Sequence, residues 1–149
     1  MSDTIAISFE VGCSAERAFD LWTNQIGTWW PADHTVTGAR DVAVVIEGAV
    51  GGRIYERTAD GVERDWGSVT AWDPPRTLAY SWHLGRDSSD ATAVTVCFVD
   101  VGEGRARIEI DHRGWEKLGV TANLWRDRNH AGWETLLPHL VAAIGKGDH

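Results

Sequence analysis

The arrangement of apolar and polar residues along the chain predicts a sheet. Ile5, Ile7, Phe9 and Val11 alternate with polar or small residues, which is the period of a strand with one buried face. Six later segments have the same character and are separated by turns that contain glycine, aspartate or proline. These segments lie at 42–47, 53–58, 66–72, 77–84, 92–99 and 105–113. The pattern therefore predicts seven strands, of which the last six form an antiparallel meander.

The apolar spacing changes to that of a helix in two regions. After the first strand, Ser14 is a candidate helix cap and Phe19 belongs to a stripe with helical spacing. Residues 24–30 predict a second short helix, which ends before Pro31 because proline cannot continue it. Apolar residues recur every three or four positions over 120–144, and this predicts one long amphipathic helix.

A curved antiparallel sheet with one apolar face needs a cover, and the C-terminal helix is the only long amphipathic segment available. We therefore expect an α+β fold. In it, a curved seven-stranded antiparallel sheet wraps around the C-terminal helix, with two short helices after the first strand. Because side chains do not always fill the space between such a sheet and its helix, a cavity is expected there. No repeat or linker interrupts the pattern, which indicates a single domain over 1–149.

Composition and charge exclude some kinds of binding partner. The chain has 22 acidic and 14 basic side chains and a net charge of −8, so it lacks the clustered Lys and Arg that bind nucleic acid. No apolar run approaches the roughly 20 residues of a membrane span, and the first residues do not resemble a signal peptide. Cys13 and Cys97 lie in apolar surroundings, which favours buried thiols over a disulfide. We therefore expect a cytoplasmic protein with no membrane insertion.

Several motifs resemble a known family. They are Gly51-Gly52-Arg53, Trp66-Gly67-Ser68-Val69, Trp72-Asp73-Pro74-Pro75-Arg76 and His112-Arg113-Gly114-Trp115-Glu116. In these the chain resembles the activator of heat-shock protein 90 ATPase homologue (AHSA-type) family, which belongs to the SRPBCC superfamily of START-like, helix-grip proteins. The resemblance implies the helix-grip fold. It implies no single function, because the superfamily includes hydrophobic-ligand carriers, polyketide cyclases and aromatases, and a co-chaperone domain.

Strand alternation and the aromatic content select candidate cavity residues. The inward positions of the strands, together with the covering helix, give a set of ten: Ile54, Glu56, Tyr80, Trp82, Val96, Phe98, Ile110, His112, Trp133 and Leu137. Nine tryptophans supply unusually large flat apolar surfaces for a core or a ligand. Trp29 and Trp30 precede Pro31 in a connection that lies beside the cavity entrance in helix-grip folds. They are candidates either for a lid or for a small core under that connection.

Two ionisable residues stand on the apolar face. A buried carboxylate such as Glu56 beside an imidazole such as His112 could act as acid and base, and the alternative is that each bonds to backbone or water near the sheet rim. The six histidines and two cysteines show no metal-ligand spacing. No nucleophile elbow or phosphate loop occurs, and no cofactor is expected.

Three classes of function follow. The leading hypothesis is a domain that binds a hydrophobic or aromatic small molecule between the sheet and the helix. On this hypothesis the protein is a binding protein rather than an enzyme. The second is an enzyme of the polyketide cyclase or aromatase type that uses Glu56 and His112. The third is a stress- or chaperone-related interaction module, which tryptophans exposed on the outer sheet face would favour. A homodimer is compatible with all three.

Overall fold

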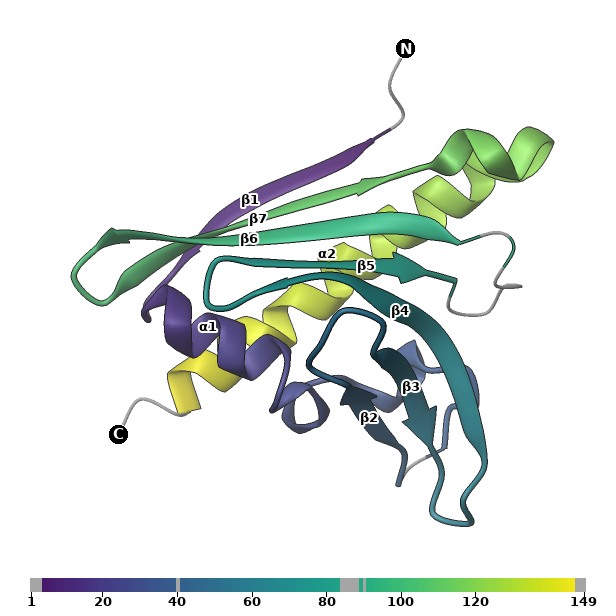
Figure 1. Cartoon of the computed structure of the whole chain (residues 1–149), viewed down its shortest axis with the longest axis horizontal. Helices are drawn as coiled ribbons and strands as arrows, with labels where there is room; N and C mark the ends of the chain where they lie inside the picture. The colour runs from purple at the N-terminus through teal and green to yellow at the C-terminus, as the bar shows by residue number, and fades with distance from the viewer. Residues whose placement is uncertain (1–3, 40, 84–88, 90, 147–149) are drawn as a thin grey trace.

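The computed structural model describes residues 4–39, 41–83, 89 and 91–146. One sheet of seven strands and one long helix dominate it (Figure 1). The elements in chain order are β1 (Ile5–Val11), α1 (Ala15–Trp22), the 3₁₀ turns η1 (Ile26–Thr28) and η2 (Ala32–His34), β2 (Ala43–Ile46), β3 (Arg53–Arg57), β4 (Glu63–Asp73), β5 (Thr77–Trp82), β6 (Thr92–Gly102), β7 (Arg105–Arg113), the 3₁₀ turn η4 (Trp115–Thr121) and α2 (Ala122–Lys146).

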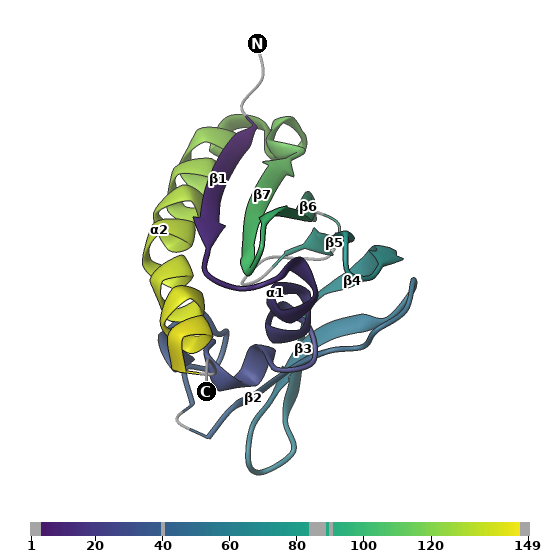
Figure 2. The same ribbon diagram turned by 90° about the vertical axis from the view of Figure 1, so that its left-hand side faces the viewer.

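All strand pairs are antiparallel, and the strand order is β1-β7-β6-β5-β4-β3-β2. Strands β2 to β7 form the predicted meander, and β1 closes it by pairing with β7, with Ile5 opposite His112. Figure 2 shows α2 running along one side of the sheet, which curves away from β1 and β7 towards β3 and β2. The predicted α+β helix-grip architecture is confirmed.

Local signals account for the first helix and for one difference from the prediction. The Ser14 side chain accepts a hydrogen bond from the Arg17 amide and so caps α1. Within the expected helix over 24–30 the structure has only the 3₁₀ turn η1, and a second 3₁₀ turn, η2, follows Pro31. η1 already ends at Thr28, with Trp29 as its C-cap, and Pro31 is the N-cap of η2, where its missing N–H costs no hydrogen bond. The predicted strand at 77–84 ends at Trp82, and Leu84 lies outside the described residues.

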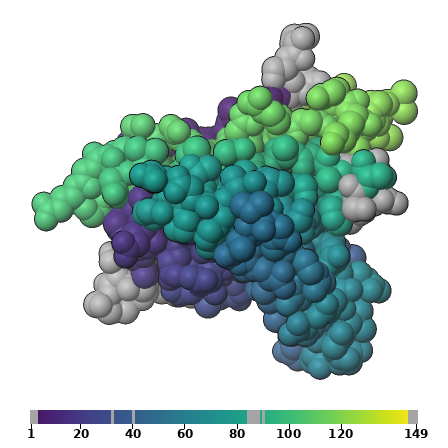
Figure 3. Space-filling view, in the orientation of Figure 1, coloured from purple at the N-terminus to yellow at the C-terminus, as the bar shows by residue number. Residues whose placement is uncertain are grey.

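The core lies between the inner face of the sheet and the two helices. Its largest fully buried side chains include Trp22 on α1, Trp66 on β4, and Trp115 on η4. On α2, Leu136, Leu140 and Ile144 are buried. The hairpins β3–β4 and β6–β7 project from the body of the molecule (Figure 3). Within the described residues, no helix combines the length and the apolar character that crossing a bilayer requires.

Candidate functional site

A pocket of about 410 Å³ opens between η2, β5 and the first half of α2. It contains four indole side chains from three parts of the chain, and polar groups at its margin. The lining residues are Trp30, Asp33, His34, Thr35, Trp82, Trp125, Arg128, Asn129, Gly132, Trp133 and Leu136. A volume in the range of roughly 300–1,000 Å³ with apolar walls and few polar groups is typical of a small-molecule site.

Asn129 joins two walls of this pocket. Its Oδ1 accepts a hydrogen bond of 3.3 Å from the Trp82 indole on β5. Its Nδ2 donates to the Trp125 carbonyl at 2.9 Å, one turn earlier on α2. Residues 125, 129 and 133 are spaced by four, so they share one face of the helix. The position of Trp82 is therefore set by the strand, through alternation, and by the helix, through Asn129.

Trp30 forms a third wall. Its ring centroid lies 5.0 Å from that of Trp66 and 6.0 Å from that of Trp82, and its Nε1 donates to the His34 carbonyl at 3.0 Å. The His34 Nε2 lies 3.1 Å from Thr135 Oγ1, which connects η2 to α2. Trp29 packs against Trp30, with ring centroids 5.6 Å apart, but it does not line the pocket, and its indole N–H donates to the Leu21 carbonyl within the core. The two tryptophans that the sequence grouped at an entrance are thus neighbours, and of the two Trp30 lines the pocket.

Trp133 connects the pocket to His112, which is fully buried behind it. The Trp133 indole N–H donates to His112 Nδ1 at 3.2 Å. Because an indole can only donate, Nδ1 is an acceptor and the ring proton is on Nε2. Nε2 lies 2.6 Å from the hydroxyl of Thr92, and that hydroxyl donates to the Trp82 carbonyl at 3.2 Å. His112 therefore links the strand and helix walls as a neutral imidazole with both nitrogens occupied.

Glu56 is fully buried on β3 and accepts four hydrogen bonds. The Val36 amide and the Trp66 indole donate to Oε1, each at 2.6 Å, while the amide and hydroxyl of Thr37 donate to Oε2 at 2.9 and 2.7 Å. Burial raises the pKa of Glu56, but these hydrogen bonds from Thr37, Val36 and Trp66 outweigh it and hold the pKa below its ordinary value. An ionised Glu56 thus anchors the segment that follows η2.

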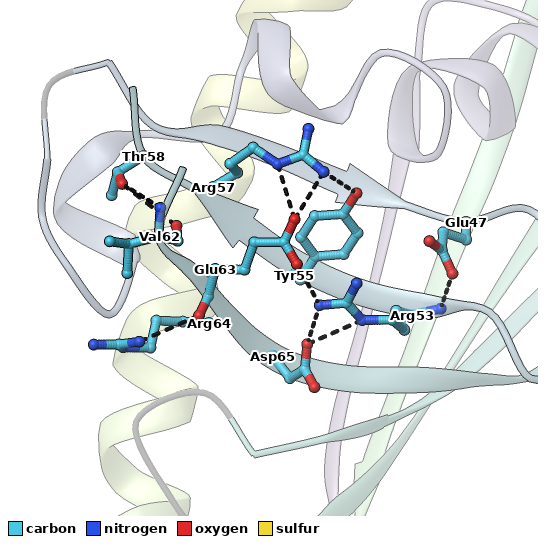
Figure 4. A network of polar contacts seen from close by, with 9 residues as sticks. All are labelled: Glu47, Arg53, Tyr55, Arg57, Thr58, Val62, Glu63, Arg64 and Asp65. Carbon is cyan, nitrogen blue, oxygen red and sulfur yellow. Dashed lines mark hydrogen bonds and ion pairs between the residues drawn. The ribbon is translucent and has the colours of Figure 1, made fainter. Parts of the chain in front are cut away.

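The outer side of β3 carries a polar network that fixes this strand to β4 (Figure 4). Arg53 pairs with Asp65 at 2.7 Å and with Glu63 at 3.0 Å, and Arg57 pairs with Glu63 at 2.8 Å. The guanidinium carbon of Arg53 lies 4.1 Å from the centre of the Tyr55 ring, and that of Arg57 lies 5.4 Å from it. Together they cover Tyr55 on the outer face while the same strand presents Glu56 inwards.

Of the ten residues predicted for a cavity, Trp82 and Trp133 line the pocket, as does Trp30 of the predicted entrance. The other eight are buried without lining it: Ile54, Glu56, Tyr80, Val96, Phe98, Ile110, His112 and Leu137. Glu56 and His112 are not brought together, since β4, β5 and β6 separate their strands and each bonds to other groups.

The sequence reasoning missed the polar margin of the pocket, which is formed by Asp33, His34, Arg128 and Asn129. The sequence does contain a signal for Arg128 and Asn129. Lining positions on α2 recur at spacings of three and four from residue 125 to residue 136, so two polar residues stand on a stripe that faces inwards. Asp33 and His34 belong to a short 3₁₀ turn, where no periodicity marks a face.

No group of three or more His, Cys, Asp or Glu side chains is arranged as metal ligands among the described residues. Both cysteines are free: Cys13 is buried, and Cys97 on β6 is half-buried. The titratable groups available to a ligand in the pocket are thus Asp33, His34 and Arg128.

A family model described as Activator of Hsp90 ATPase homolog 1-like protein matches residues 12–145, most of the chain. The chain belongs to this family. The predicted resemblance is therefore confirmed. A comparison with curated proteins gave no match.

Solved structures similar to this family member include two with higher sequence identity. CalC, a self-sacrificing resistance protein from Micromonospora echinospora, is 29% identical with a TM-score of 0.74, over 97% of this chain and 95% of CalC. Txn09, an anthrahydroquino-gamma-pyrone synthase complexed with SUM, is 32% identical with a TM-score of 0.58, over 85% of this chain and 88% of Txn09. The Aha1 dimer from Colwellia psychrerythraea, 18% identical with a TM-score of 0.69 over 98% of each chain, is similar in fold.

The motifs that carry the resemblance to the Hsp90 ATPase activator homologues have structural roles here. Gly67 follows the buried Trp66, and a Cβ atom at this position would lie 1.8 Å from the Ser81 carbonyl oxygen on β5. Gly51 has a φ of +89°, which non-glycine residues rarely adopt. Trp66 itself donates to Glu56. These motif residues therefore shape the sheet behind the pocket, and the pocket's own polar residues lie outside them.

Proposed function

We propose that this chain binds a planar aromatic small molecule in the pocket under α2. The observation that carries the proposal is the set of four indoles around one opening. The N–H groups of Trp30, Trp82 and Trp133 are all bonded to protein acceptors, so these residues offer their ring surfaces to a ligand. Aromatic rings stack on such surfaces with favourable free energy beyond the burial of area.

The similarity to Txn09 supports an aromatic ligand. Its name describes an enzyme that forms a fused aromatic pyrone, and the likeness at 32% identity covers most of both chains. The name supplies a ligand class to test, namely flat fused-ring molecules. The printed role of CalC, self-sacrificing resistance, names no ligand.

Gly132 offers a direct test because it lies on the pocket wall and an added Cβ would meet no atom within 4 Å. Gly132→Leu should place a side chain in the pocket, and its Cβ has room there. Leucine is also the better helix former, by about 0.5–1 kcal/mol. We expect this variant to fold with equal or higher stability and to lose binding of an anthracene carboxamide in isothermal titration calorimetry.

Gly145→Leu is the matched control, since Gly145 also lies on α2 with open space around it but does not line the pocket. It should bind as the wild type does. The proposal would be wrong if Gly132→Leu bound the carboxamide as tightly as Gly145→Leu, or if the wild type bound no fused-ring compound from a panel.

A second candidate function is that of an enzyme of the polyketide cyclase type. The 32% sequence identity to Txn09, which is named as a synthase, favours it. The sequence hypothesis assigns acid and base roles to Glu56 and His112. The carboxylate and the imidazole on the pocket surface are instead those of Asp33 and His34. If a linear polyketide mimic is turned over, loss of turnover in Glu56→Gln would support the first assignment. If His34→Gln lost turnover while Glu56→Gln stayed active, the catalytic residues would instead be those at the pocket margin.

The interaction-module hypothesis depends on exposed tryptophans. Seven of the nine are buried, and Trp72 and Trp125 are half-buried, so the outer surface presents no exposed indole. This leaves ligand binding as the better supported function. A cytoplasmic location and a homodimer stay predictions, the second being compatible with the dimeric Aha1 neighbour.

A further inference from the structure

Among the described residues, Arg128 is the one basic side chain of fixed charge that lines the pocket. Its guanidinium carbon lies 5.0 Å from the centre of the Trp125 ring, so the cation is held against an aromatic wall. Within the described part of the chain, no carboxylate forms an ion pair with it, although the neighbouring Arg126 pairs with Asp127 at 3.4 Å. Arg128 is thus an exposed residue at the margin, beside Trp125, with a charge that no described protein group neutralises.

The neighbouring helix positions leave room beside this cation. Gly132 follows Arg128 by four residues and Leu136 follows Gly132 by four, so the three form one row along α2. Because Gly132 has no side chain, the row has a gap between the guanidinium and Leu136. A flat ring that enters this gap would have one edge next to Arg128.

The other charged groups of the pocket lie across the opening. Asp33 and His34 belong to η2, whereas Arg128 belongs to α2. No ion pair joins Asp33 to Arg128. His34 is held by Thr135, and Asp33 is exposed to solvent. The two margins of the pocket therefore differ in charge, with the cation on the helix side.

We propose that the aromatic ligand carries an anionic oxygen group, such as a carboxylate, which Arg128 binds while the rings lie against the indoles. This inference rests on the proposed function and adds the charge and the orientation of the ligand. The planar guanidinium offers two parallel N–H donors to a carboxylate, and its contact with Trp125 reduces the conformational freedom lost on binding.

The test compares two ligands with the same rings, an anthracene carboxylate and its carboxamide, by isothermal titration calorimetry. We expect the wild type to bind the carboxylate roughly fivefold more tightly, which is modest because the site is open to water. Arg128→Gln should lower the carboxylate affinity to that of the carboxamide and leave the carboxamide affinity unchanged. Arg128→Lys should retain part of the preference. High salt should reduce the preference in the wild type.

Arg107→Gln provides the charge-matched control, because Arg107 lies on β7 outside the pocket and the substitution changes the net charge equally. It should keep the preference. The inference is overturned if Arg128→Gln retains the preference, if it weakens both ligands equally, or if a trimethylammonium analogue of the same rings binds best. Binding of the carboxamide with no carboxylate preference would overturn this inference alone. Binding of neither ligand would overturn the proposed function itself.

Discussion

Glu56 and His112 are the two ionisable side chains that strand alternation places on the apolar face, and both are fully buried. Alternation could predict their direction because it depends only on the backbone. Their partners come from elsewhere in the chain: Thr37 from a loop, and Trp133 from α2. Their burial could therefore be predicted from the sequence, but the choice between catalysis and anchoring could not.

The hydrogen bonds of Glu56 predict a pH-dependent stability. Glu56→Gln replaces a carboxylate that accepts four hydrogen bonds with an amide whose NH₂ group cannot accept any. We expect it to lower the free energy of unfolding at neutral pH by about 1–3 kcal/mol. Because the pKa of Glu56 is lowered in the folded state, its stabilising contribution is present above the ordinary value of 4.5 and is lost as pH falls through the folded pKa.

Urea denaturation of wild type and variant as a function of pH measures this contribution. The difference in unfolding free energy should be largest at neutral pH and should shrink below pH 4.5. Glu103→Gln, in the exposed turn between β6 and β7, is the control and should have little effect at any pH. A constant difference across the pH range would show that the carboxylate charge is not what anchors the loop.

Close contact between β4 and β5 explains why a glycine stands at position 67. Gly67→Ala would place a Cβ 1.8 Å from a backbone oxygen of Ser81, which cannot move aside as a side chain can. We expect a loss of unfolding free energy of about 3 kcal/mol or more, or failure to fold. Gly102→Ala, where a Cβ meets nothing within 4 Å, should change it by less than about 1 kcal/mol. Equal effects in chemical denaturation would contradict the contact.

The stripe on α2 predicts that Asn129 matters for binding through Trp82. Asn129→Ala removes the acceptor of the Trp82 indole and the donor to the Trp125 carbonyl. Affinity for an anthracene carboxamide should fall roughly threefold to tenfold in calorimetry, because the two walls are no longer fixed relative to each other. Asn24→Ala removes a comparable hydrogen bond on the exposed side of α1 and should have no effect. Equal affinities of the two variants would refute this role.

Periodicity predicted the elements well because each depends on neighbours along the chain. It fixed the inward faces of β5 and β7 and the extent of α2 to within two residues. It was less accurate where segments are short or capped by proline, as in the two 3₁₀ turns around Pro31. It also placed Leu124 and Val141 on the apolar stripe of α2, where both are exposed. Because the neighbouring Leu140 and Ile144 are buried, Val141 is exposed through the side of the helix that it occupies.

Whether an inward-facing residue lies in the packed core or lines an open pocket is determined by the arrangement of the whole molecule. All ten predicted cavity residues are buried, yet most of the space they face is filled by Trp22, Phe98 and their neighbours. Whether side chains fill a volume depends on the curvature of the sheet and the position of α2, which no local pattern contains. The opening remains near η2, where Gly132 leaves room and Trp30, Trp82 and Trp125 line the pocket.

The nine tryptophans provide the most direct test of the central claim, since each has one indole N–H signal in a heteronuclear NMR spectrum. These signals can be assigned by replacing one tryptophan at a time with phenylalanine. Titration with an anthracene carboxylate should shift the signals of Trp30, Trp82, Trp125 and Trp133 in a saturable manner. The signals of Trp72 and Trp115, which do not line the pocket, should stay in place. Absence of saturable shifts, or the largest shifts at Trp72 and Trp115, would contradict binding in this pocket.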